Sequence, residues 1–276
     1  MLYLVLVLSV FATSVLSGIL GMAGGMILMA ILVSTLTVAG AMMVHGAVQA
    51  TANGSRAWFL RQHIQWRIMP IYGLGAGTAL AGFAALTLVP DAAVVLILVG
   101  TFPFLARVNR RLSGLDITDG FTTFGCGVFV TAAQLLAGAS GPLLDVFYLN
   151  TPLNRYQIIA SKAITQTLGH VLKLIYYGLI VGDGEWLPWW LYPVAMATAV
   201  GGTRAGTKLL DRWNDDHFRV VSGRVILTIA AVCVVKGSYD LLSECAVASE
   251  LVGFTTNNRS PAFTCWPLLI LMRVTS

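Results

Sequence analysis

The chain has 276 residues, of which 57% are hydrophobic and 11% are charged, whereas a soluble domain carries roughly 25% charged residues. This composition excludes an ordinary water-soluble domain, because so few charges cannot cover a water-facing surface. The net charge of +5 comes from basic residues in short gaps between apolar runs. That distribution excludes a nucleic-acid-binding surface and indicates loops that set orientation in a membrane.

Ten apolar segments follow one another along the chain, and at about 20 residues per span they predict an all-α membrane protein. Their approximate bounds are 2–20, 25–40, 42–61, 68–89, 92–109, 119–138, 142–153, 155–178, 187–209 and 219–241. Segments 25–40 and 142–153 are short for a full span, and each follows a glycine-rich break, at Gly21–Gly25 and Gly138–Pro142. Whether these two short segments cross completely is left open by the sequence.

The two halves of the chain share an order of features, which predicts an internal repeat. The shift that places Gly21 on Gly138 also places Gln49 on Gln166. Each half then reads as span, glycine break, short segment, polar-striped helix, glycine-rich helix and final span. The predicted organisation is a first transmembrane repeat at 1–115, a second at 116–242 and a C-terminal tail of unassigned role at 243–276.

Basic residues occur in alternate gaps between the segments. The gaps at 56–67 and 204–219 contain arginine and lysine, whereas the gap at 182–185 contains neither. The positive-inside rule therefore predicts that the first two gaps share the cytoplasmic side and that the third lies opposite. Because each repeat has an odd number of segments, the two repeats would have inverted topology, as in many secondary transporters.

Segments 42–61 and 155–178 each carry four polar residues at spacings of four, four and three, which place them on one helical face. These two stripes are His45, Gln49, Asn53 and Arg56, and Lys162, Gln166, His170 and Lys173. Polar residues are costly in a bilayer and normally face a bundle interior or a wet cavity. The matched stripes favour a substrate path, with interhelical hydrogen bonding as the alternative. For Arg56 and Lys173, nearer the helix ends, the alternative is snorkelling to the interface.

The two glycine breaks predict interrupted helices inside the membrane. The start of a half-helix exposes backbone N–H groups, and such N-termini attract anions. The residues predicted at these starts are Gly24, Gly25, Ser140 and Gly141. The alternative is close helix packing through small residues. We prefer packing for Gly73 and Gly77 and for Gly202 and Gly206, because each pair is spaced by four.

Other chemistry is sparse in this sequence. Asp145 lies in an apolar segment, where it can pair with Lys162, carry a proton or lie at the membrane interface. No nucleophile–base set, metal-ligand cluster or nucleotide-binding motif occurs in a credible context. We therefore expect no enzyme activity, no cofactor and no metal.

The Gly21–Gly25 break, the helix from His45 to Arg56 and their second-half counterparts resemble the sulfite exporter TauE/SafE family. The resemblance covers roughly residues 5–240. It implies a permease for sulfur-containing anions such as sulfite, sulfoacetate or related organosulfonates, in a bacterial inner membrane. The exact substrate does not carry over, and the tail has no recognised counterpart.

The sequence thus predicts a multi-pass transporter that exports a small anion bound between the two breaks and the two stripes. Gln49 and Gln166 would donate hydrogen bonds, and Lys162 would supply positive charge. The predicted substrate-binding residues are Gly24, Gly25, His45, Gln49, Asn53, Ser140, Gly141, Lys162, Gln166 and His170. The alternatives are a carrier for another solute or ion, an intramembrane enzyme and a membrane scaffold.

The expected partners are the small anionic substrate and the lipid bilayer. Coupling to protons and coupling to the membrane potential are both left open, as are the direction of flux and the oligomeric state. No nucleic-acid partner is expected.

Overall fold

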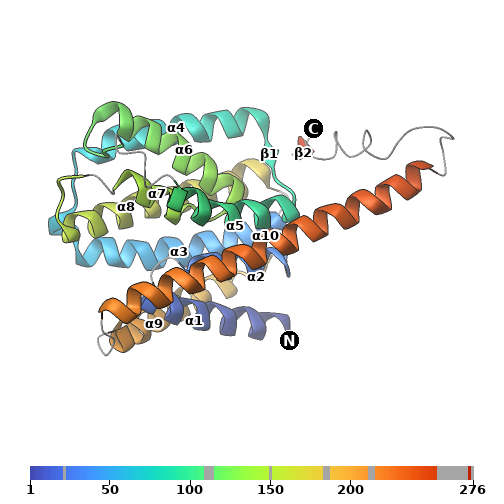
Figure 1. The fold of residues 1–276 in the computed structure, drawn as a ribbon, viewed down its shortest axis with the longest axis horizontal. Coiled ribbons are helices and arrows are strands. Elements are labelled where there is room, and N and C mark those ends of the chain that lie inside the picture. Colours follow the sequence, from blue (N-terminus) through green and yellow to red (C-terminus); the bar gives the residue numbers. More distant parts are fainter. Residues whose placement is uncertain are drawn as a thin grey trace.

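The computed structural model describes residues 1–20, 23–108, 115–148, 151–182, 187–210, 215–253 and 273–274. The described chain is almost entirely helical (Figure 1). The helices are α1 (Leu2–Leu20), α2 (Ala23–Val33), α3 (Val38–Phe59), α4 (Ile68–Leu86), α5 (Ala92–Val108), α6 (Gly120–Ala137), α7 (Gly141–Phe147), α8 (Arg155–Ile175), α9 (Leu191–Leu210) and α10 (Asp215–Gly253). The smaller elements are the 3-10 turn η1 (Arg61–His63), the π-helix η3 (Tyr176–Val181) and the antiparallel pair β1 (Leu88–Val89) and β2 (Arg273–Val274).

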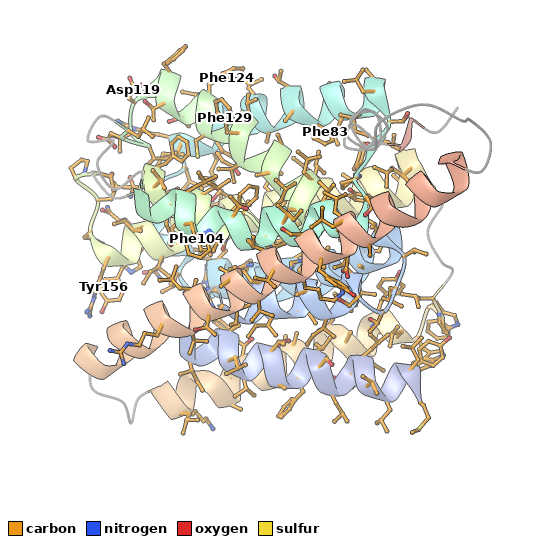
Figure 2. All side chains as sticks on the ribbon, turned by 45° about the vertical axis from the view of Figure 1, so that its right-hand side comes forward. Phe83, Phe104, Asp119, Phe124, Phe129 and Tyr156 are labelled. Carbon is orange, nitrogen blue, oxygen red and sulfur yellow. The ribbon has the colours of Figure 1, made fainter. Side chains whose placement is uncertain are left out.

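The predicted fold class, an all-α membrane protein, is confirmed. Within the described residues, five helices are long and apolar enough to cross a bilayer, in the stretches Leu2–Ile19, Ile68–Leu86, Gly120–Ala137, Arg155–Val181 and Arg224–Glu244. Large apolar side chains point outward around the bundle, as Phe129 does with 70% of its surface exposed (Figure 2). Such a surface is expected where lipid, not water, is the surrounding solvent. The inverted orientation of the two halves stays a prediction.

Two predicted segments end elsewhere than expected. The segment 25–40 splits, because α2 ends at Val33 and the Ser34 hydroxyl donates back to the Ala30 carbonyl at 2.8 Å. Thr37 then caps α3 by accepting from the Gly40 N–H at 3.3 Å. At the other end of the chain, α10 continues to Gly253, past the predicted start of the tail at residue 243.

The two polar-striped helices, α3 and α8, pack against each other in opposite directions. Lys173 near the end of α8 contacts His45 near the start of α3. Further along, Thr167 lies against Gly54. Tyr156 at the start of α8 stacks on His63, just beyond the end of α3, with ring centroids 5.4 Å apart. The two stripes therefore face each other along one antiparallel interface.

Helices α6 and α7 form a hairpin that returns to the end of the bundle where it began. The turn at Gly138, where φ is +71°, lies beside Lys173, in the last turn of α8. The Phe147 carbonyl at the end of α7 accepts from the Ile117 N–H, just before α6, at 3.1 Å. With seven residues and about 1.5 Å per residue, α7 is far too short to span a bilayer as a helix. The chain nevertheless returns, so the second glycine break lies inside the bundle.

Outer helices pack in pairs through glycines. A Cβ on Gly75 of α4 would lie 2.2 Å from the Phe124 carbonyl oxygen of α6, and one on Gly206 of α9 would lie 2.2 Å from the Val15 carbonyl oxygen of α1. The predicted packing role of Gly73 and Gly77 is wrong, because no atom of the described residues lies within 4 Å of a Cβ at either position. The pairs α4–α6 and α9–α1 use corresponding helices of the two halves, which is the pattern that related repeats would produce.

Candidate substrate site

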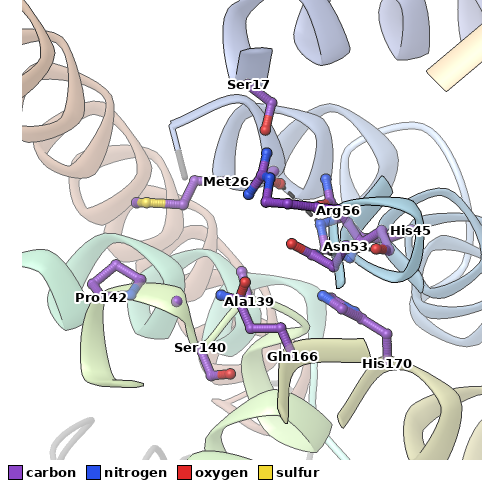
Figure 3. Close-up of a pocket in the computed structure, with 13 residues that line it drawn as sticks. Ser17, Met26, His45, Asn53, Arg56, Ala139, Ser140, Pro142, Gln166 and His170 are labelled. Atoms are coloured by element: carbon purple, nitrogen blue, oxygen red, sulfur yellow. Dashed lines mark hydrogen bonds between the residues drawn. The ribbon is translucent and has the colours of Figure 1, made fainter. Parts of the chain in front are cut away.

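A cavity lies where the two glycine breaks meet α3 and α8 (Figure 3). Its volume is about 40 Å³, measured as the space open to the centre of a water-sized sphere. One water molecule needs about 10–15 Å³ on this measure. The cavity therefore has room for a small group of a few non-hydrogen atoms.

Most of the predicted site residues line this cavity. From the first half they are Gly25, His45, Gln49 and Asn53, and from the second half Ser140, Gly141, Gln166 and His170. Gly25 of the first break, the second break and the two stripes therefore meet at one place, whereas residues 21–22 of the first break lie outside the described residues. Their role in binding a substrate stays a prediction.

Two predicted site residues lie elsewhere. Gly24 faces α1, because a Cβ at this position would lie 2.0 Å from the Thr13 carbonyl oxygen. Glycine at this position allows the backbones of α1 and α2 to approach closely. Lys162 forms an ion pair with Asp145 of α7 and does not line the cavity. Its position therefore gives no support to a direct charge contact between Lys162 and an anion.

Arg56 is a lining residue that the sequence analysis did not include in the site. In Figure 3 its side chain extends toward Ser17 of α1, and among the described residues no carboxylate forms an ion pair with it. Arg56 also lines a larger groove between α3 and α9, of about 850 Å³ on the same measure, together with Arg204 and Lys208. Arg56 therefore belongs to the lining of both the cavity and this basic groove. The cavity lining also contains Met26, Ala139 and Pro142.

Lys173 lies behind the cavity and has no exposed surface. Its Nζ lies 2.9 Å from His45 Nδ1 and 3.0 Å from the Gly138 carbonyl oxygen. On the other side of the imidazole, His45 Nε2 lies 2.9 Å from the Gly25 carbonyl oxygen. A carbonyl only accepts, so Nε2 carries the hydrogen and Nδ1 accepts from Lys173. Snorkelling is therefore excluded for Lys173, whose amine lies in the protein interior.

A second polar chain runs through Gln134 of α6, which the sequence analysis did not single out. Its Nε2 donates to the Gly138 carbonyl at 3.0 Å and lies 2.7 Å from His170 Nδ1, closer than the 3.5 Å to His170 Nε2. Its Oε1 accepts from the Ser140 hydroxyl. Because an amide NH₂ only donates, His170 Nδ1 accepts and Nε2 carries the ring hydrogen. The sequence feature that points to Gln134 is a single side-chain amide in an otherwise apolar helix, four residues before Gly138.

The lining of the cavity suits a negatively charged ligand. Among the described residues, the lining contains a guanidinium, two imidazoles and three side-chain amides, and no aspartate or glutamate. Gly25 belongs to the first turn of α2, where backbone N–H groups have no partner within the helix. Pro142 lacks an N–H, so the start of α7 offers fewer donors than the sequence pattern suggested. Among the described residues, no three His, Cys, Asp or Glu side chains gather as metal ligands.

Residues 6–233 match the family described as sulfite exporter TauE/SafE. No curated protein and no solved structure matches the chain.

Proposed function

The chain belongs to the sulfite exporter TauE/SafE family of membrane transporters, and from this premise we propose that it is a permease for a small sulfur-containing anion. Sulfite and small organosulfonates such as sulfoacetate are the proposed substrates. Export across the cytoplasmic (inner) membrane of a bacterium is the proposed direction and location.

The observation that carries the proposal is a small cavity whose described lining residues include a guanidinium and no carboxylate. Arginine presents a planar fork of donors that matches oxyanions in a bidentate way. A volume of about 40 Å³ suits a group the size of sulfite or a sulfonate head better than a long organic solute.

The placement of the cavity between the two halves supports a carrier over a static binding protein. Gly25 and His45 come from the first half, and Ser140 and Gln166 come from the second. Carriers built from inverted repeats bind their substrates where the repeats meet, beside interrupted helices. Movement of one half against the other would then open the cavity to each side of the membrane in turn.

Two measurements on the purified protein test the proposed function. Sulfite, methanesulfonate and sulfoacetate should raise its melting temperature, because a ligand at 100 times its Kd stabilises the folded state by about 2.7 kcal/mol. Acetate and simple cations serve as comparison ligands. In liposomes, the anions that stabilise the protein should also be transported. Stabilisation by cations alone, or binding without any transport, would contradict the proposal.

A further inference from the structure

Lys173 is a buried amine with no counter-charge beside it among the described residues. It has no exposed surface, and among the described residues no carboxylate forms an ion pair with it. Lys162, only three helical turns away on α8, is paired with Asp145. Burying an unpaired charge costs several kcal/mol. An anion in the cavity would supply a counter-charge for a protonated Lys173, because Lys173 contacts His45, which lines the cavity.

The two hydrogen bonds of Lys173 persist with or without its third proton. A neutral amine has two N–H groups, and two acceptors are present, His45 Nδ1 and the Gly138 carbonyl. An ammonium keeps both bonds and gains a third N–H. If the extra proton moves to His45 Nδ1, the ring donates to the amine lone pair, and its Nε2 still donates to Gly25. The site can therefore gain or lose one proton without breaking its contacts.

The other titratable groups around this pair are few. His170, on the same helix as Lys173, lies with its ring centroid 5.5 Å from that of His45. Arg56 of α3 lines the same cavity as His45. The hydroxyl of Tyr177, in the π-helix after α8, donates to the Leu135 carbonyl of α6. In their contacts with the pair, α2 and α6 present only carbonyl oxygens, those of Gly25 and Gly138.

We propose that Lys173 and His45 share one proton that is taken up from water when the anion binds in the cavity and is released when the anion leaves. This inference rests on the proposed function. Bound proton and bound anion stabilise each other, so each raises the affinity for the other by the same factor. The carrier would then move both in the same direction. A dianion accompanied by one proton still carries net negative charge, which an inside-negative potential drives outward.

The test is proton uptake on anion binding by the purified wild-type protein. Methanesulfonate is the probe, because it stays ionised throughout the range from about pH 6 to about pH 9 and cannot itself exchange protons there. Its binding is followed by calorimetry in buffers of different ionisation enthalpy. We expect uptake of up to one proton per bound anion within this range. Binding with no uptake at any pH in the range would overturn the shared proton while leaving the proposed function intact.

Variants locate the proton. Lys173→Met should abolish the uptake and weaken binding at least tenfold. Lys173→Arg keeps a fixed charge that cannot be lost, so it should bind the anion without uptake. His45→Gln, which keeps a side chain that accepts from Lys173, covers the case in which both Lys173 variants fail to fold. This variant should reduce the proton uptake.

The matched control is Lys162→Met combined with Asp145→Leu, which removes a second lysine outside the cavity and should retain wild-type uptake.

Three outcomes would count against the proposal. Full uptake in Lys173→Arg or in His45→Gln would remove the named residue from the proton site. Anion binding without proton uptake in the wild type would show that Lys173 stays charged throughout and only caps the end of α6. If sulfite, methanesulfonate and sulfoacetate all fail to bind, the proposed function itself fails and takes the proton site with it.

Discussion

Arg56 is the residue whose charge faces the cavity most directly. Replacing it with glutamine should lower anion affinity at least about tenfold, because hydrogen bonds to a charged group contribute about 1.5–3 kcal/mol. Arg56→Lys retains the charge but not the bidentate fork. Its anion affinity should therefore lie between those of the wild type and Arg56→Gln. The measurement is the anion dependence of the melting temperature, after confirming that each unliganded variant is monodisperse. Unchanged affinity in Arg56→Gln would exclude a contact with the substrate.

The ion pair between Lys162 and Asp145 should contribute to stability more than to binding. Lys162→Met leaves a carboxylate without its partner and should cost about 1–2 kcal/mol, less than the 3–5 of a fully buried pair, since 22% and 33% of the two side chains are exposed. The double variant with Asp145→Leu should recover most of this loss. Denaturant unfolding measures the stability and calorimetry the anion affinity. A double variant that is stable but binds anions poorly would return Lys162 to the site.

Gln134 should act on binding indirectly, by holding His170 and Ser140 in place. Gln134→Leu removes the donor to His170 and leaves the Ser140 hydroxyl without its acceptor. We expect a loss of about 1–3 kcal/mol in stability, the usual cost of a buried polar group without a partner. Anion affinity should fall as well. The comparison of unfolding and binding curves checks both effects, and an unchanged affinity would show that the network is structural only.

Periodicity predicts the direction of a side chain around its helix but not its depth or its partner. The four-residue spacing placed Lys162 on the same face as Gln166, which lines the cavity, yet Lys162 lies one turn nearer the helix start, where Asp145 contacts it. Gly24 and Gly25 are neighbours that point about 100° apart on a helix, so one faces α1 and the other the cavity. Gln134 belongs to no stripe, so only the packing of α6 against α8 reveals it.

Among the helices, the contact of α4 with α6 offers a controlled test of close packing. Gly75→Ala places a methyl group 2.2 Å from a backbone oxygen, so the helices must separate, at a cost of about 1–3 kcal/mol. Gly77 lies two residues further along α4. The methyl group of Gly77→Ala would have no atom of the described residues within 4 Å. This variant should be neutral or stabilising by up to about 1 kcal/mol, because alanine favours a helix over glycine. Equal stability of the two variants in denaturant unfolding would contradict the packing described here.

For the whole molecule, the packing order of the helices makes the predicted membrane orientation testable. Residues at the ends of α3 and α9 line one groove, so they lie at the same end of the bundle. The antiparallel pairing of α3 and α8 puts Gly182 at the opposite end. In a cysteine-free background, Gln62→Cys and Lys208→Cys should label only from the cytoplasm, and Trp189→Cys only from outside. Labelling of all three positions from one side would contradict the positive-inside assignment.

The pairing of α3 with α8 also imposes an order of events on synthesis of the chain. Although α3 has 22 residues, its polar stripe leaves it outside the described helices that are apolar enough to cross a bilayer alone. A charged side chain at the centre of the membrane costs about 2.5–3.5 kcal/mol on insertion scales. Its partner begins only at Arg155, so at about 5–20 residues per second α3 waits for roughly 5–20 s. We expect ribosome-bound chains ending before Arg155 to hold α3 against the insertion machinery, where a photo-crosslinker at Gln49 would detect it, and chains extending past Val181 to release it into the lipid.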